Sequence, residues 1–187
     1  FYEIRDQKHN DGRYHPRTGI SKKTLYQVVS NKEELVTKVL QHKMQEDLAT
    51  LKRIKAESID AIDEMLKITR YILGTLHDLS PTAVFDLNKY YGAIWKQIQG
   101  AHHLHLFELI RDNLQRGIKQ GLYRSKINPD IIARLYVAKS SLIVDEEIFP
   151  ARDFNLSDLF EETIAYHMHG VASSKGLALL EKHLHEN

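Results

Sequence analysis

The chain has 187 residues, of which 42% are hydrophobic and 27% are charged. This composition is typical of a globular protein with a sizeable core. Cysteine is absent, which excludes disulfides, thiolate metal sites and cysteine nucleophiles. The sequence contains no run of 18 apolar residues to span a membrane, and residues 1–20 do not resemble a signal peptide. We therefore expect a cytoplasmic protein with no membrane partner.

The net charge of +1 conceals an asymmetry along the chain. Residues 1–32 contain seven lysines and arginines and three acidic residues, whereas residues 33–187 contain 19 and 22. A basic start on a mildly acidic body favours a polyanionic partner at one end of the protein. An ordinary solvated terminus is the alternative.

Helical periodicity from residue 31 to the end predicts an all-α fold. Ser30 and Glu33 form a predicted capping box at the start of a helix that continues to about residue 53. The apolar stripe of this helix is Val36, Leu40, Met44, Leu48 and Leu51. A second stripe ends before Ser80-Pro81, which is a typical helix start; it comprises Ile62, Met65, Leu66, Thr69, Ile72, Leu73 and Leu76.

Residues 81–100 are aromatic and less regular, which predicts two short helices or one that breaks at Tyr90-Tyr91-Gly92. A long helix follows, and Gly121 fits its C-terminal cap because glycine accepts the left-handed conformation. The stripe of this helix is Leu104, Phe107, Ile110, Leu114 and Ile118.

Two further long helices are expected, near 130–148 and 156–172. Asn128-Pro129-Asp130 opens the first, and Pro150 closes that segment. Asn155 or Ser157 caps the second, and a tail helix runs from Lys175 to Leu184.

The most informative segment is Gly19 to Val36, GISKKTLYQVVSNKEELV. Its pattern predicts a turn at Gly19 and a short helix with Leu25 and Val28 facing inward. Lysines and hydroxyls at the start of a short helix suit contact with phosphates and base edges. The candidate DNA-binding residues are Ser21, Lys22, Lys23, Thr24, Tyr26, Gln27 and Lys32.

This segment resembles the second half of the helix-turn-helix of TetR-family transcriptional regulators. The matching elements, in the family's order and spacing, are Gly19, Ile20-Ser21, Thr24-Leu25-Tyr26 and Lys32-Glu33-Glu34-Leu35. A looser likeness lies at Gly117 and Gly121-Leu122-Tyr123-Arg124. Residues 1–18 depart from the family pattern, with Pro16 where a helix interior is expected.

The resemblance implies a DNA-binding domain over residues 1–53, irregular or incomplete at 1–18, and a helical ligand-binding and dimerisation domain over 54–187. It further implies a homodimeric repressor that a small-molecule effector releases from a palindromic operator on double-stranded DNA. The ligand-pocket candidates are Phe85, Tyr90, Tyr91, Trp95 and Phe107. The dimer-interface candidates are Ile132, Leu135, Leu142, Leu159, Ile164 and Val171, some of which must instead face the protomer core.

Two other classes of function remain open at this stage. One is an all-α protein-interaction module that does not bind DNA. The other is a metal-binding helical enzyme that uses His102 and His105, which share a helix face, with His77 or Asp78 as a further ligand. The sequence contains no metal-site, phosphate-loop or nucleophile-elbow motif. We therefore expect no enzymatic activity, no catalytic or metal-ligating residues and no cofactor.

Overall fold

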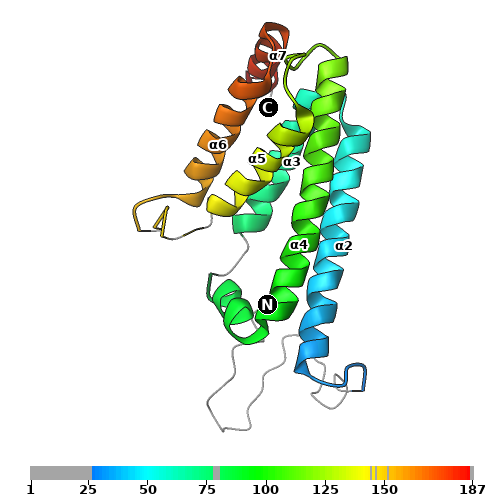
Figure 1. Cartoon of the computed structure of the whole chain (residues 1–187), viewed down its shortest axis with the longest axis vertical. Coiled ribbons are helices and arrows are strands. Elements are labelled where there is room, and N and C mark those ends of the chain that lie inside the picture. Colours follow the sequence, from blue (N-terminus) through cyan, green and yellow to red (C-terminus); the bar gives the residue numbers. More distant parts are fainter. Residues whose placement is uncertain (1–26, 78–80, 144, 146, 151, 186–187) are drawn as a thin grey trace. The chain divides into compact units, whose positions relative to one another are not determined.

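The fold is all-α, as the periodicity predicts. The computed structural model describes residues 27–77, 81–143, 145, 147–150 and 152–185 (Figure 1). In this part of the chain the helices are α2 (Lys32–Glu57), α3 (Ala61–His77), α4 (Pro81–Lys119), α5 (Pro129–Leu142), α6 (Leu156–Val171) and α7 (Ser174–His185). The β pairing within these ranges is a single antiparallel bridge between Tyr123 and Ala172.

The chain divides into two compact units. The smaller unit comprises residues 1–47 and 79–99, and the larger unit comprises residues 48–78 and 100–187. Both α2 and α4 therefore contribute residues to each unit. The predicted division of function after residue 53 stays a prediction, because this grouping rests on packing alone.

The smaller unit has a compact apolar core. Val36 and Leu40 from α2 are buried with Leu87 from α4. Four partly buried side chains of α4 pack against them, namely Tyr91, Ile94, Trp95 and Ile98. The predicted apolar stripe of the first helix therefore begins as expected.

The start of α2 differs by one residue from the predicted capping box. Asn31, and not Ser30, is the cap, because its Oδ1 accepts the backbone N–H of Glu34 at 2.8 Å. The carboxylate of Glu34, and not that of Glu33, accepts the Ser30 N–H at 2.7 Å. An amide oxygen one residue later supplies the cap as well as a hydroxyl does. The returning Glu34 bond goes to the residue before the cap and not to the cap itself.

The residues just before α2 also correct a prediction. Val28, which we expected to face inward, is 70% exposed, and Val29 is buried in its place. Adjacent valines have equal apolar character, so the sequence pattern does not separate them, and the cap at Asn31 fixes which one turns inward. Leu25 lies outside the described residues.

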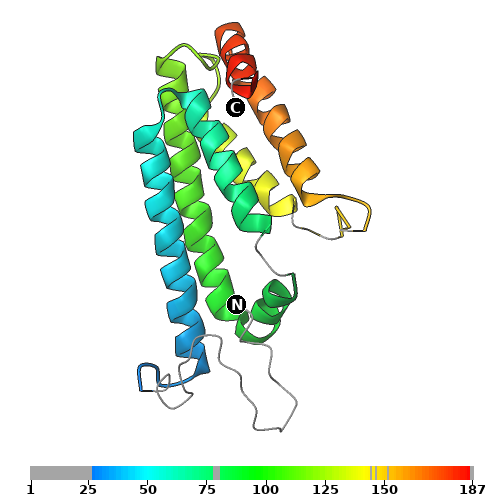
Figure 2. The same cartoon turned by 180° about the vertical axis from the view of Figure 1, so that it is seen from behind.

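The larger unit holds the main core, to which α3, α4, α5, α6 and α7 all contribute. In the views of Figure 1 and Figure 2, α5 and α6 run side by side, with α7 at one end of the pair. The most deeply buried apolar side chains of this core include Ile62, Met65, Ile110, Leu114 and Met168. Leu104 is a correction, because it is 57% exposed and Leu106 is buried in its place.

The helix boundaries within and after α4 match the sequence signals. Tyr91 has non-helical dihedral angles (φ −133°, ψ 32°), which confirms the predicted break at Tyr90-Tyr91-Gly92. Gly121 has a φ of +69°, which confirms the left-handed cap. This turn leads the chain from α4 toward α5.

Asparagine caps start both α5 and α6. Asn128 Oδ1 accepts the N–H groups of Asp130 and Ile131, and Asn155 Oδ1 accepts that of Ser157. Asn155 is thus the cap of α6. However, α5 ends at Leu142 and does not reach residue 148. The Asp145 side chain accepts the Glu147 N–H, a local bond that favours a turn over a continued helix.

Candidate functional site

The predicted DNA-binding segment is only partly covered by the described residues. Ser21, Lys22, Lys23, Thr24 and Tyr26 lie outside them. Of the other two candidates, Gln27 is exposed and Lys32 is the first residue of α2.

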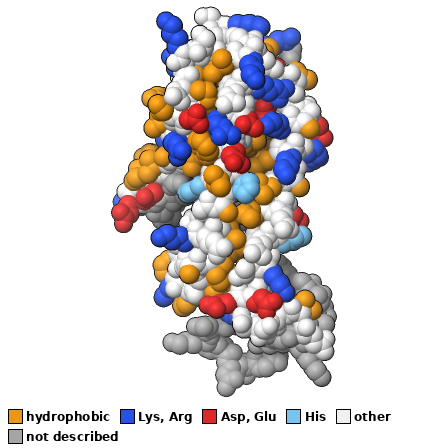
Figure 3. All heavy atoms as spheres, turned by 45° about the vertical axis from the view of Figure 1, so that its right-hand side comes forward, with side chains coloured by type: hydrophobic (Ala, Val, Ile, Leu, Met, Phe, Trp, Pro, Cys, Tyr) orange, Lys and Arg blue, Asp and Glu red, His pale blue; other side chains and the backbone are white. Residues whose placement is uncertain are grey.

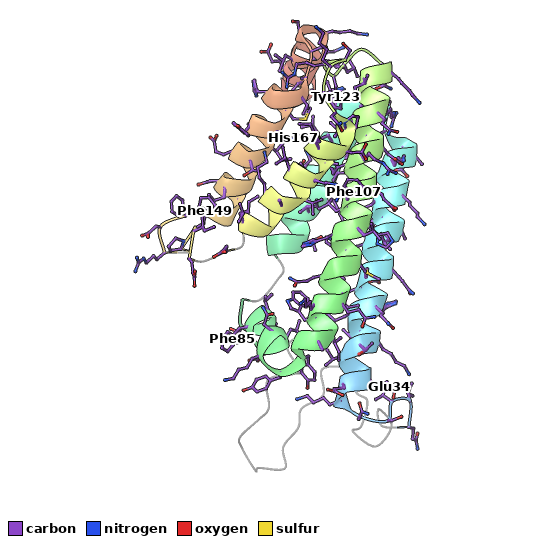
Figure 4. All side chains as sticks on the ribbon, in the orientation of Figure 1. Glu34, Phe85, Phe107, Tyr123, Phe149 and His167 are labelled. Atoms are coloured by element: carbon purple, nitrogen blue, oxygen red, sulfur yellow. The ribbon has the colours of Figure 1, made fainter. Side chains whose placement is uncertain are left out.

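The chain that follows this segment is fixed to α2 by short-range polar contacts. Lys38 Nζ donates to the Val28 carbonyl at 3.1 Å and forms an ion pair with Glu34 at 2.8 Å. These bonds, together with the Ser30 amide, hold the pKa of Glu34 well below its usual range, near 2. In Figure 4, Glu34 marks this start of α2. The contacts order residues 28–38, directly after the lysine-bearing segment.

The predicted aromatic ligand pocket is distributed over both units. Phe85 is 62% exposed and Tyr90 is 52% exposed, with Lys89 Nζ about as far from one ring centroid (5.6 Å) as from the other (5.3 Å). Tyr91 and Trp95 pack against the core of the smaller unit. Phe107 packs against the core of the larger unit. The smaller-unit residues thus form two groups, one exposed and one partly buried, and Phe107 belongs to a different core.

The candidate interface residues separate into inward-facing and outward-facing positions. Ile164 and Val171 are buried in the protomer core. Ile132 and Leu159 are partly buried against the same core. Leu135 and Leu142 are 53% and 45% exposed. Exposure therefore retains only the last two as fully outward-facing members of the predicted set.

Sequence reasoning missed two further members of this exposed surface. Ile131 is 57% exposed and Tyr166 is 74% exposed, with Lys139 Nζ 4.7 Å from the Tyr166 ring centroid. Ile131, Leu135 and Leu142 recur at spacings of four and seven residues, so they share one side of α5. We call Ile131, Leu135, Leu142 and Tyr166 the outer face of the α5–α6 pair.

A buried polar cluster joins α3, α4 and the turn before α5. Asn113 Nδ2 donates to Glu64 Oε2 at 3.0 Å, and Arg116 Nη1 forms an ion pair with the same oxygen at 3.1 Å. The Tyr123 hydroxyl contacts Asn113 Oδ1 at 2.9 Å and the Ala61 carbonyl at 3.0 Å. We call Glu64, Asn113, Arg116 and Tyr123 the Tyr123 junction. Glu64 and Asn113 are completely buried, and no local sequence signal marks either.

The glycines of this region now have a physical explanation. A Cβ on Gly117 would collide with the Tyr123 ring, so the ring packs directly on the glycine backbone. Burial and the nearby Glu64 carboxylate raise the pKa of the Tyr123 phenol far above its usual range. The phenol is therefore a permanent hydrogen-bond donor (Figure 4). The likeness at Gly117 and Gly121-Leu122-Tyr123 thus corresponds to a built structural junction.

A buried histidine lies on the inner side of the α5–α6 pair. The His167 ring packs edge-on against Tyr136, with the ring centroids 4.8 Å apart. Burial, and to a lesser extent the charge of Lys139, lowers the pKa of His167 to about 4. His167 Nε2 is buried without a hydrogen-bond partner in the part of the chain that is described. His167 is therefore neutral at pH 7 and contributes to the packing of this core.

The histidines considered as metal ligands make other contacts. His105 Nδ1 contacts the Ala101 carbonyl at 2.7 Å. The side chain of His77 and all of Asp78 lie outside the described residues. Among the residues that are described, no three His, Asp or Glu side chains are placed to hold a metal ion.

No protein-family model, curated protein or solved structure matches the chain. None of the helices in the described ranges combines the length and apolar character that crossing a bilayer requires. The functional argument accordingly rests on the residues themselves.

Proposed function

We propose that the chain is a DNA-binding transcriptional regulator of the TetR type that acts as a homodimer. The observation that carries this proposal is the sequence motif from Gly19 to Leu35, whose pattern predicts a glycine turn and a lysine-bearing short helix before the Lys-Glu-Glu-Leu helix start. The contacts at the start of α2 support it, because they give the motif's last part a defined helix start at Lys32.

The outer face of the α5–α6 pair supports a homodimer. A helix with apolar residues on two sides normally buries both of them. On α5, Tyr136 is buried in the protomer core. Ile131, Leu135 and Leu142, on one side of the same helix, are exposed. A second copy of the same face would cover these side chains around a two-fold axis. Such a dimer would present two recognition helices to one palindromic site.

Release by an effector is the regulatory part of the proposal. An effector shifts binding only by its difference in affinity between two states of the protein, typically about 1–3 kcal/mol of coupling. Because α2 and α4 each contribute to both units, they are the segments through which such a shift would pass. The proposal assigns repression to the ligand-free dimer.

The direct test selects genomic fragments that the purified chain retains and measures their affinity by fluorescence anisotropy over a range of salt concentrations. We expect a palindromic site and an affinity that falls steeply with salt, because lysine–phosphate contacts release counterions. Lys23→Glu should remove binding, whereas Lys126→Glu, a matched change in the exposed turn before α5, should keep it. Equal affinity of the two variants would contradict the assignment of the recognition helix.

The protein-interaction module remains a second candidate, because the outer face of the α5–α6 pair would also suit a different protein. The same selection separates the two candidates. Retention of DNA without any sequence preference, together with a monomeric chain in sedimentation, would favour the module. A metal-binding enzyme has no supporting observation in the described residues.

A further inference from the structure

An arginine pair meets one aromatic ring in the larger unit. The guanidinium carbon of Arg134, from α5, lies 4.8 Å from the Phe107 ring centroid, and that of Arg111, from α4, lies 5.5 Å from it. Figure 4 places Phe107 on α4, and the Arg134 contact shows that the ring is turned toward α5. We call Phe107, Arg111 and Arg134 the arginine–phenylalanine cluster. The ring face attracts each guanidinium, but two like charges held on one ring repel each other.

The acidic side chains near the cluster do not balance these charges. Asp112 contacts Arg111 at 3.6 Å, a long ion pair, while its other oxygen is bound to Lys55 at 2.8 Å. The Lys55 bond is the first cause of the lowered pKa of Asp112, ahead of the charge of Arg111. In the upper half of the face drawn in Figure 3, basic and acidic side chains lie beside one another.

The nearest acids along the two helices do not compensate either. Glu108 precedes Arg111 by three residues and Asp130 precedes Arg134 by four. Within the described residues, neither acid comes within ion-pair distance of either arginine, and Arg134 has the Phe107 ring as its only polar or charged contact. The cluster thus has two guanidinium groups, and the one carboxylate that contacts it, that of Asp112, is also paired with Lys55.

Arg111 also keeps an unused hydrogen-bond donor. Its Nε is buried and has no acceptor among the described residues. A buried N–H without an acceptor costs free energy, and native proteins rarely leave one unfilled. The Nε–Nη edge of a guanidinium matches two oxygens of a carboxylate or a phosphate. An anion that reached this edge after a small movement of the Arg111 side chain would satisfy the donor and offset part of the positive charge of the pair.

We infer that the arginine–phenylalanine cluster is a binding site for a small anion with a carboxylate or phosphate group. Arg111 supplies the paired donors, Arg134 adds the second positive charge, and Phe107 holds both guanidiniums in position. The identification of this anion with the effector rests on the proposed function. The anion site itself does not, because all three side chains belong to the larger unit.

The test is a calorimetric titration of the full chain, without DNA, with inorganic phosphate and with sodium benzoate at constant ionic strength. We expect one saturable site, and the tighter probe shows whether a phosphate or a carboxylate is preferred. Arg134→Gln should weaken binding about tenfold, because the second positive charge beside the anion is lost. Arg134 is exposed, so this change should leave the fold intact.

Two further variants separate a site from general attraction to positive charge. Arg124→Gln removes an exposed arginine from the turn before α5 and should change affinity less than about twofold. Phe107→Leu keeps an apolar side chain but removes the ring that holds the guanidiniums, and should weaken binding severalfold. The inference is overturned if neither probe saturates, or if the Arg124 and Arg134 variants lose affinity equally.

An operator-binding assay with and without the tighter probe then examines the effector role separately. We expect the probe to reduce operator affinity in the wild type and to have less effect in Arg134→Gln. Saturable anion binding by a chain that does not bind DNA would support the anion site and contradict the proposed function. Binding of an operator without binding of either probe would support the proposed function and contradict the anion site.

Discussion

The inner and outer sides of the α5–α6 pair differ in the burial of their side chains, although the same two helices supply both. On the inner side, Tyr136, His167 and Met168 are buried, and the pair ends at the Tyr123–Ala172 bridge. On the outer side, Leu135 and Tyr166 are more than half exposed. The inner side is covered by the chain itself, whereas the outer side is the apolar area that the proposed second copy would cover.

This difference in burial indicates which side chains determine the stability of the protomer and which would determine its association. Burial on the inner side depends on fitted contacts, so changes there should alter the free energy of unfolding. Changes on the outer side should leave a single protomer almost unaffected and alter association. The four predictions below test this division from the largest expected effect to the smallest.

Gly117→Ala should cause the largest loss, because its methyl group would displace the Tyr123 ring and break the buried hydroxyl bonds. We expect the free energy of unfolding to fall by about 3 kcal/mol in urea denaturation at fixed protein concentration. Gly74→Ala, in α3 with nothing within 4 Å, is the control. It should stabilise the protein by up to about 1 kcal/mol, since alanine is the better helix former. Similar losses in both variants would contradict the role of the junction.

Acid should weaken the inner side through His167. Its pKa is about 4 in the folded protein against about 6.5 in an unfolded chain, so the unfolded state binds more protons between these values. Stability should therefore be unaffected above pH 6.5 and fall by about 3 kcal/mol as the pH drops to 4. The measurement compares unfolding across this range for the wild type and for His167→Phe, which keeps a ring against Tyr136 but cannot titrate.

The control for this pH dependence is His169→Gln, because His169 is exposed on the same helix. That variant should retain the acid-induced loss. If His167→Phe retains the loss as well, another group is responsible.

Leu135→Glu should affect association and leave the unfolding of the protomer nearly unchanged. A charge in the centre of a self-complementary face appears twice in a dimer, so we expect the dimer dissociation constant to rise at least about 30-fold, or about 2 kcal/mol. Analytical ultracentrifugation over a concentration series measures it. Ile59→Glu, at a position that is 75% exposed in the larger unit but lies outside the pair, is the control. An unchanged association in Leu135→Glu would move the interface elsewhere.

The smallest effect is expected at the N-terminus of α5, which supports both sides of the pair. Asn128→Ala removes an oxygen that accepts two backbone N–H groups, and should cost about 1 kcal/mol in thermal or urea unfolding. Asn128→Asp keeps an acceptor and should restore most of the loss. Loss in both variants would show that the amide nitrogen matters more than the cap.

The sequence predicted the features that depend on neighbours within a few residues. The all-α class, the caps at Asn128 and Asn155, the break at Tyr91 and the left-handed Gly121 were all confirmed. In each case one side chain or one backbone requirement decides the local structure. These features therefore follow from propensity and capping rules alone.

The errors arose where two neighbouring residues compete or where the partner is remote in sequence. Val28 and Val29 are adjacent, equally apolar and outside α2, so no helical periodicity indicates which of them is buried. Glu64 and Asn113 are residue types usually found at the surface. They are buried here because they hydrogen-bond to each other although they lie 49 residues apart in the sequence. For the candidate site, the lysine-bearing motif stays a prediction, and Phe107 was expected in an aromatic ligand pocket. The sequence pattern gave no sign of the two arginines that contact its ring.

The bridge between the residues just before α5 and just after α6 has a consequence for which positions of the sequence can vary. Arg124 N–H donates to the Val171 carbonyl and Ser173 N–H to that of Leu122, both at 2.9 Å, and the Ser173 hydroxyl donates to the Gly121 carbonyl at 2.8 Å, so the two ends of this long segment are tied together mainly through backbone groups. None of these bonds uses a side chain of the outer face of the α5–α6 pair. Substitutions on that face can therefore accumulate without loosening the tie between the start of α5 and the end of α6.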